Sequence, residues 1–339
     1  MWRIVAALTC VLGGCDGCGN DGSRHILDSP RASADTKTGD SGTIVDASDP
    51  NSVLFVAQSP PGPQNGDPAT WSGVLQFSIS GDFAATVPET GISKTALEDP
   101  SSVAFRSESS ELFIGNRHGN NAADGVAGSI SRYHYDQGSH ALVAATEITG
   151  NGLAGVHQIA FSPTSGEMFA ANVATGVSRF TFDAGGTVTA NGMISDTATR
   201  GVFVTPDGKR LLVTAATTAI RVFDLATSAE LPATTVSGQG GLHYFAYRLG
   251  DVYVAGLYDN AVYRYHLDAN DDLVFVQLIA AQAPIGVAFS ADGAEMFVSG
   301  HLTVDLLQRY TYDAGSDTWM PSGTMDLGSS LGGLALVPG

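Results

Sequence analysis

Short runs of apolar residues alternate with polar ones along most of the chain, and the same order of runs returns six times. Each unit has an apolar first strand, a turn rich in Ser, Pro, Asp and Gly, a second strand such as 211–215, a third strand such as 263–267, and a weaker fourth strand such as 142–148. A period of two residues interrupted by Gly, Asp and Pro is typical of half-buried antiparallel strands. The pattern therefore predicts an all-β chain.

Units of roughly 40 to 50 residues made only of short strands predict a β-propeller, because one four-stranded blade cannot bury both its faces without neighbours. The first unit, which starts near Val53, lacks a first strand, whereas the last stretch, 331–338, is a first strand with nothing after it. We therefore predict a six-bladed β-propeller of four-stranded blades, in which the C-terminal strand pairs in the first blade and closes the ring.

The N-terminus has the layout of an export signal. Arg3 precedes an apolar run, 4–12, that is too short to span a bilayer, and the run leads into Leu12-Gly13-Gly14-Cys15. These four residues resemble a bacterial lipobox, which implies a lipoprotein signal peptide at 1–14 and lipidation of Cys15, palmitate included. Attachment of more than one acyl chain gives stable anchoring. We expect a lipid-anchored, extracytoplasmic protein of the bacterial cell envelope.

The stretch that follows the signal is rich in Ser, Asp, Gly and Thr and has no apolar periodicity. Such a composition cannot bury enough surface to offset chain entropy, so residues 15–50 are predicted to be a disordered tether and 51–339 the propeller. The three cysteines, Cys10, Cys15 and Cys18, all precede the propeller, which therefore contains no disulfide.

The formal net charge of −18 argues against nucleic acid as a partner, because phosphate binding needs a basic surface. No motif implies a cofactor.

Polar residues that do not recur from blade to blade are the candidates for function. First strands should start, and second strands end, at the same face of the ring, which we call the top. Four residues before the end of each first strand lies one member of a ring: Ser101, His157, Arg200, His243, Ile285 and Gly332. Residues just after second strands add Asn116, Arg117, His118, Asn172 and His301. His and Arg converging on one mouth could bind a carboxylate or phosphate, or perform acid–base chemistry.

Two other interpretations of these residues stay open. Polar groups that line a channel can simply solvate a water-filled hole. His157, His243 and His301 could instead hold zinc, although we assign no metal to them.

Five arginines recur at one position of the third strand, and recurrence favours an architectural role. We expect them to pair one blade with the next. They are Arg132, Arg179, Arg221, Arg264 and Arg309.

Two segments resemble repeats of the bacterial lactonase-type (YVTN-like) propellers: VHQIAFSP at 156–163 and RGVFVTPDGK at 200–209. The resemblance implies that His157 and Arg200 belong to a substrate site. The acidic partner of that family falls on Ala216 in this chain, and the family has seven blades where we count six.

Two functions follow from these observations. One is a membrane-anchored propeller that binds a partner protein or a small anionic ligand on its top face, where the long connections 59–72 and 117–128 also lie. The other is a lactonase-like hydrolase or lyase, in which His157 is the acid–base group and Arg200 and His243 hold the substrate carboxylate. The sequence leaves open whether the protein is an enzyme.

Overall fold

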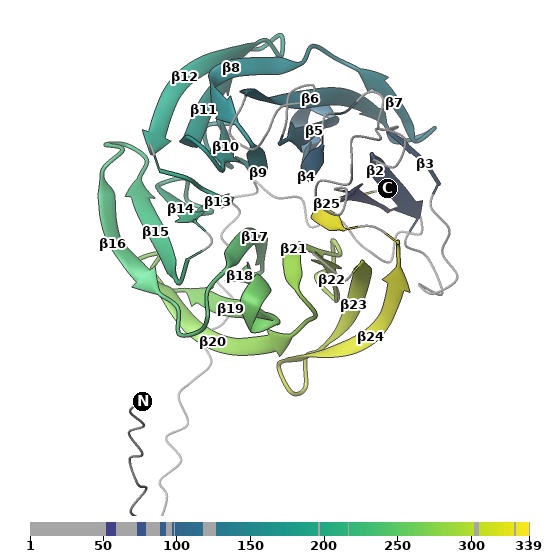
Figure 1. Ribbon diagram of the computed structural model, residues 1–339, viewed down its shortest axis with the longest axis vertical. Helices are drawn as coiled ribbons and strands as arrows, with labels where there is room; N and C mark the ends of the chain where they lie inside the picture. Colours follow the sequence, from purple (N-terminus) through teal and green to yellow (C-terminus); the bar gives the residue numbers. More distant parts are fainter. Residues whose placement is uncertain are drawn as a thin grey trace, which may run out of the picture. The chain divides into compact units, whose positions relative to one another are not determined.

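Six antiparallel sheets surround a common axis as the blades of a propeller (Figure 1). The computed structural model describes residues 52–58, 73–78, 89–92, 97, 99–117, 127–195, 197–215, 217–301, 305–328 and 330–338. Among these residues, no helix has the length and apolar character needed to span a membrane.

Each blade has its innermost strand at the axis and its last strand at the rim (Figure 1). From the axis outwards, blade 1 contains β25 (Leu331–Val337), β1 (Val53–Gln58), β2 (Val74–Ser78) and β3 (Glu89–Ile92). Blade 2 contains β4 (Pro100–Arg106), β5 (Glu111–Asn116), β6 (Ala127–Asp136), and outermost β7 (Ala141–Ala144) and β8 (Ile148–Ala154). Blade 3 contains β9 (Val156–Phe161), β10 (Met168–Asn172), β11 (Gly176–Phe182) and β12 (Val188–Ser195).

Blade 4 contains β13 (Gly201–Val204), β14 (Arg210–Thr214), β15 (Ala219–Asp224) and β16 (Glu230–Thr235). Blade 5 contains β17 (Leu242–Arg248), β18 (Asp251–Gly256), β19 (Ala261–Leu267) and β20 (Leu273–Ala280). Blade 6 contains β21 (Pro284–Phe289), β22 (Glu295–Gly300), β23 (Leu306–Asp313) and β24 (Thr318–Asp326). Two short 3₁₀ turns, η4 (Ser107–Ser109) and η5 (Leu257–Asp259), follow β4 and β18.

The last strand closes the ring, as predicted. β25 pairs antiparallel with β1, with Val337 opposite Val53 and Leu334 opposite Val56. Both strands are buried along most of their length, so the joint belongs to the core. The six-bladed architecture and its closure by the C-terminal strand are therefore confirmed.

The core lies between neighbouring blades. Phe113 and Ile130 of blade 2 pack with Met168 and Phe180 of blade 3 in one apolar cluster, and all four are almost completely buried. Each blade thus buries its flat faces against the next, which is why the unit is stable only as a ring.

The recurring arginines form their main ion pairs within their own blades, so the expected pairing between blades is wrong for these contacts. Arg132 faces Phe113 across the β5–β6 ladder and binds Glu111, two residues along β5, at 2.6 Å. A diagonal neighbour of this kind lies within reach of a long side chain. Arg179–Glu167, Arg264–Asp251 and Arg309–Glu295 repeat the arrangement, whereas Arg221 pairs with Glu230 of β16. Some second contacts do cross blades, since Arg264 also binds Asp317 at 2.7 Å.

Blade 2 departs from the other blades at its outer edge. The predicted fourth strand, 142–148, is divided into β7 and β8, which pair with different halves of β6. In blades 3 to 6 the fourth strands β12, β16, β20 and β24 are uninterrupted. The break at 145–147 leaves the outer side of blade 2 open toward blade 3.

Candidate functional site

Backbone hydrogen bonds at the top of the ring bring the starts of first strands beside the ends of second strands. The amide of Arg200 donates to Thr214 O at 2.8 Å, that of Arg117 to Asp99 O at 3.0 Å, and that of His301 to Ala283 O at 3.0 Å. Residues that are far apart in sequence therefore share one end of the axis. We call the group formed by Arg117, His157, Arg200, His243 and His301 the top mouth.

His157, at the start of β9, is 3% exposed. Its Nδ1 lies 3.3 Å from the hydroxyl of Tyr244, and that hydroxyl donates its only proton to Ser101 O at 3.0 Å. His157 Nδ1 must therefore carry a hydrogen, which leaves the lone pair on Nε2. Nε2 is shielded from solvent and has no hydrogen-bond partner among the described residues. Burial, together with the charges of Arg117 and Arg200, holds the pKa of His157 well below its ordinary value.

His243 has the same protonation pattern, because its Nδ1 donates to Gly241 O at 2.6 Å. The Nδ1 of His301 lies 3.0 Å from Leu331 O and 2.7 Å from the hydroxyl of Ser330. Burial, followed by the charge of Arg200, lowers the pKa of His243 to about 3. Burial also lowers the pKa of His301, against the opposing effect of the Leu331 carbonyl. All three imidazoles are therefore neutral at neutral pH.

The two arginines of the top mouth differ in their partners. Arg117 Nε lies 3.7 Å from Asp99 Oδ2, and the Asp99 carboxylate is almost fully buried. The partly exposed side chain of Arg200 makes no hydrogen bond or ion pair with any residue that the structure describes. The charges of both arginines contribute to the lowered pKa values of all three imidazoles. With Arg117 balanced by Asp99, the described part of the top mouth carries one unbalanced positive charge, on Arg200.

Two predicted ligand-binding residues turn out to be structural. Asn172 is completely buried, donates to Ala170 O, Gly176 O and Ser178 Oγ, and accepts from the amide of Ala154. These bonds occupy its amide, so Asn172 joins β10 to neighbouring segments of blades 2 and 3.

Asn116 is also completely buried, and it donates to the hydroxyls of Ser129 and Ser131 within blade 2. Its contacts are those of a strand-pairing residue rather than a surface group, because no part of it reaches solvent. His118, Cys15 and the connections 59–72 and 118–126 lie outside the described residues.

The axis of the propeller is filled at its upper level, which the strand pattern did not predict. Tyr244 of β17 reaches across the axis to Ser101 of β4 and packs against Gly333 of β25. Gln158 of β9 accepts from the amides of Val202 and Phe245 and donates to Phe245 O at 2.7 Å. A water-filled channel that runs through the ring is thus replaced by a polar plug.

A sequence signal for this plug exists one position beyond the predicted ring of polar residues. The residues three before each first-strand end are Ser102, Gln158, Gly201, Tyr244, Gly286 and Gly333. Two large polar residues thus stand among three glycines and one serine. A Cβ at Gly333 would lie 3.1 Å from the Tyr244 ring, and one at Gly201 would lie 3.1 Å from Gln158 Oε1. The small residues make room for the large ones.

Below the plug the axis opens again. A hollow of about 410 Å³ at the bottom face is lined by Val103, Ile159, Ala288, Ala335 and other apolar residues, with Gln158 as one of its polar members. The top mouth and this bottom hollow are therefore separate spaces.

The structure offers no support for zinc at the top mouth. Within the described ranges, no group of three or more His, Cys, Asp or Glu side chains is arranged to hold a metal ion. His157, His243 and His301, which come from blades 3, 5 and 6, do not form such a group.

Neither a scan against protein-family models nor a search of curated proteins gives a match. Solved structures do match. The periplasmic gluconolactonase of Pseudomonas aeruginosa superposes with a TM-score of 0.59 at 15% identity, covering 84% of this chain and 99% of that one. A protein from Bacteroides uniformis described as a candidate 6-phosphogluconolactonase gives 0.57 at 16% identity, covering 82% and 83%.

A chain in the crystal structure of a nidogen/laminin complex gives a TM-score of 0.58 at 11% identity, covering 84% of this chain and 98% of that one. The protein thus has the fold of lactonase-like β-propellers. Because a chain from a complex of another kind matches as well, these likenesses concern the fold and assign no activity.

Proposed function

We propose that this protein binds a small anionic ligand, a carboxylate or a phosphate, at the top mouth, and that a lipid on Cys15 holds it at the outer side of a bacterial membrane. The observation that supports the binding proposal is Arg200, a guanidinium with no hydrogen bond or ion pair among the described residues. A planar guanidinium with all its donors available is well suited to two-point recognition of a carboxylate or phosphate.

The surroundings of Arg200 favour an anion over other ligands. The three imidazoles are neutral and Arg117 is balanced by Asp99, so the local excess charge is positive although the whole chain is strongly negative. Partial burial strengthens the attraction, because the effective dielectric constant is lower than in water. A partner protein bound through the top connections is the less supported alternative, since no described contact favours it.

Calorimetric titration with gluconate, 6-phosphogluconate and inorganic phosphate tests the proposal. Arg200→Gln should weaken binding at least tenfold, because one desolvated ion pair is lost. The matched control is Lys209→Gln, which removes the same charge from an exposed turn where Lys209 pairs with Asp207. Equal affinities for wild type and Arg200→Gln would contradict the proposal.

A second candidate is lactone hydrolysis, favoured by the unpartnered Nε2 lone pair of neutral His157. A neutral imidazole can take a proton from an attacking water, which at the shielded Nε2 requires that substrate binding opens access to this atom. Turnover of a lactone panel that includes gluconolactone should then fall at least a hundredfold in His157→Ala. If the wild type turns over no lactone while it binds gluconate, the binding function stands and the hydrolase is rejected.

The membrane anchor is tested separately. Metabolic labelling with an alkynyl palmitate should mark the wild-type chain in a bacterial host and leave Cys15→Ala unlabelled. Labelling that persists in Cys15→Ala would rule out lipidation at this residue.

A further inference from the structure

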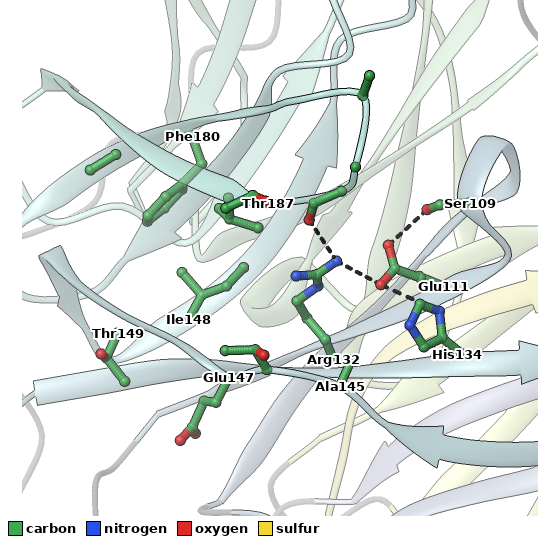
Figure 2. Close-up of a pocket in the computed structure, with 16 residues that line it drawn as sticks. Ser109, Glu111, Arg132, His134, Ala145, Glu147, Ile148, Thr149, Phe180 and Thr187 are labelled. Atoms are coloured by element: carbon green, nitrogen blue, oxygen red, sulfur yellow. Dashed lines mark hydrogen bonds and ion pairs between the residues drawn. The ribbon is translucent and has the colours of Figure 1, made fainter.

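A groove of about 660 Å³ lies on the outer side of the ring between blades 2 and 3. It is formed where the fourth strand of blade 2 is interrupted at 145–147 and where the β11–β12 turn of blade 3, residues 183–187, approaches it. We call it the blade 2–3 groove, and Figure 2 shows the residues that line it. Its volume is within the range of sites for small organic ligands.

The floor of the groove is a buried ion pair. Glu111 is fully buried and accepts from Arg132 Nη2 at 2.6 Å and from the hydroxyl of Ser109 at 2.8 Å. The Arg132 side chain is 9% exposed, and Nη2 also donates to Gly186 O at 3.2 Å. Its other terminal nitrogen, Nη1, makes no hydrogen bond with the described residues and is turned away from Glu111 (Figure 2). Nε is the shielded, unpartnered nitrogen of this side chain, whereas Nη1 is open to the groove, so a ligand there can accept a hydrogen bond from Nη1.

The same arginine position is covered in blades 5 and 6. Arg264 of blade 5 lies beside the uninterrupted strand β20, with Gln277 directly opposite, and it binds both Asp251 and Asp317. Arg309 of blade 6 is likewise opposite Gly323 of β24. The ladders of blades 2, 3 and 4 all skip this position, at Arg132, Arg179 and Arg221. In blade 2 the outer strand is also interrupted beside it, and the Arg132–Glu111 pair lines the groove there.

The charges around the groove favour an uncharged ligand. Arg132 is already balanced by Glu111, and the exposed carboxylate of Glu147, which has no ion pair or hydrogen bond within the described chain, disfavours an anion. A cation would face the Arg132 guanidinium. The ligand should therefore be uncharged, with oxygens that accept from Arg132 and hydroxyl groups that donate to Glu147.

The remaining walls of the groove also suit an uncharged ligand that carries hydroxyl groups. Thr149 and Thr187 offer hydroxyls, while Ile148, Val188 and Phe180 present apolar surface. A polyhydroxylated ring meets both requirements of the groove. Its hydroxyls donate and accept hydrogen bonds, and its C–H faces pack on apolar side chains. We propose that the blade 2–3 groove binds a neutral saccharide, independently of the anion site at the top mouth.

Saturation-transfer difference NMR on the full-length protein with lactose, maltotriose and N,N′-diacetylchitobiose, each at millimolar concentration, tests the proposal. At least one of these neutral sugars should give a signal with the wild type. Ala184→Trp, which places an indole in the mouth of the groove, should raise the dissociation constant at least tenfold.

The matched control is Ala314→Trp. Ala184 and Ala314 are both exposed, and each sits in an Asp-Ala-Gly turn in which the Asp Oδ1 accepts from the Gly amide, at 2.8 Å for Asp183 and 2.9 Å for Asp313. Only Ala184 lines the groove, so Ala314→Trp should bind sugar as the wild type does. The proposal is overturned if no sugar gives a signal, if both variants bind equally well, or if gluconate competes for the signal as strongly as the neutral sugars.

Discussion

Two imidazoles of the top mouth are fixed in one tautomer by their Nδ1 partners. For His243 the partner is a backbone carbonyl, and for His157 it is a tyrosine hydroxyl whose proton is used elsewhere, so both rings keep a lone pair on Nε2. The rings therefore offer acceptors rather than positive charge. At this site the attraction for an anion depends on Arg200. The histidines accept hydrogen bonds, so they favour a ligand that carries hydroxyl or other protonated groups near its anionic group.

Protonation of these rings should destabilise the fold. Burial lowers the pKa of His243 from 6.5 to about 3, so between these pH values the unfolded chain binds a proton that the folded protein refuses. Stability is then fully present above pH 6.5 and is lost as the pH falls toward 3. In urea unfolding between pH 8 and pH 4, His243→Asn should show a shallower slope, by up to about 1 kcal/mol per pH unit. A slope as steep as that of the wild type would contradict this.

Crowding at the axis gives a second prediction at this scale. A Cβ at Gly201 would lie 2.2 Å from the carbonyl oxygen of His243, which is backbone and cannot swing aside. Gly201→Ala should therefore cost about 1–3 kcal/mol of unfolding free energy in urea titrations. Gly138→Ala, whose Cβ would meet only Asp136 Oδ1 at 3.6 Å, should change stability much less. Similar losses in both variants would mean that the axis can relax.

The sequence identified the residues of the top mouth better than it identified their roles. Position counting was enough to bring His157, Arg200 and His243 to one end of the axis, because that follows from strand direction alone. It could not show that the side chain of Asn172 is buried within its blade while that of His301 belongs to the top mouth. Whether a side chain turns into the blade or toward the axis depends on its hydrogen-bond partners. Tyr244 and Gln158 could not be predicted because their function in the fold is to fill space left by residues of other blades.

At the scale of single strands, the arginine–acid pairs differ in depth from blade to blade. The side chains of Arg264 and Asp251 are 9% and 8% exposed, whereas those of Arg221 and Glu230 are 21% and 45% exposed. Removing one partner of a buried pair leaves an uncompensated charge in the core, while an exposed charge is resolvated. The arginines therefore share a sequence position, but their ion pairs contribute unequally to the stability of the fold.

Asp251→Asn should lower the unfolding free energy by about 3 kcal/mol or more, and Glu230→Gln by less than about 1 kcal/mol. Chemical denaturation of the two variants beside the wild type measures both values. Equal effects would show that Arg264 finds enough compensation in Asp317, which it also binds.

The outer edge of blade 2 marks the limit of prediction from strand patterns. Residues 142–148 read as one strand because Ala145, Thr146 and Glu147 include no glycine or proline that would end it. The interruption comes from the register, since β7 and β8 pair with separate halves of β6. Such a choice depends on the partner strand and is invisible in the segment itself.

For the molecule as a whole, the joint between β25 and β1 carries the stability of the ring. Leu331 is fully buried and packs in a cluster with Leu54 and Val56 of β1. Leu331→Asp should cost about 4 kcal/mol or more, since an unpaired carboxylate would be buried there. Leu249→Asp, at a position that is 63% exposed, is the control and should leave the thermal unfolding midpoint nearly unchanged. Equal midpoints for the two variants would show that the joint is dispensable.

Because the innermost strand of blade 1 follows every other blade in the sequence, the polypeptide cannot complete its ring until the ribosome has synthesised that strand. Until then β1, which is synthesised early, has an unpaired apolar edge that can form non-native strand pairs. A premature stop codon just before Leu331 would thus release a chain in which β1 lacks its inner partner strand and the ring stays open. Such products should be found in aggregates or as substrates of proteases, even though every other blade is encoded intact.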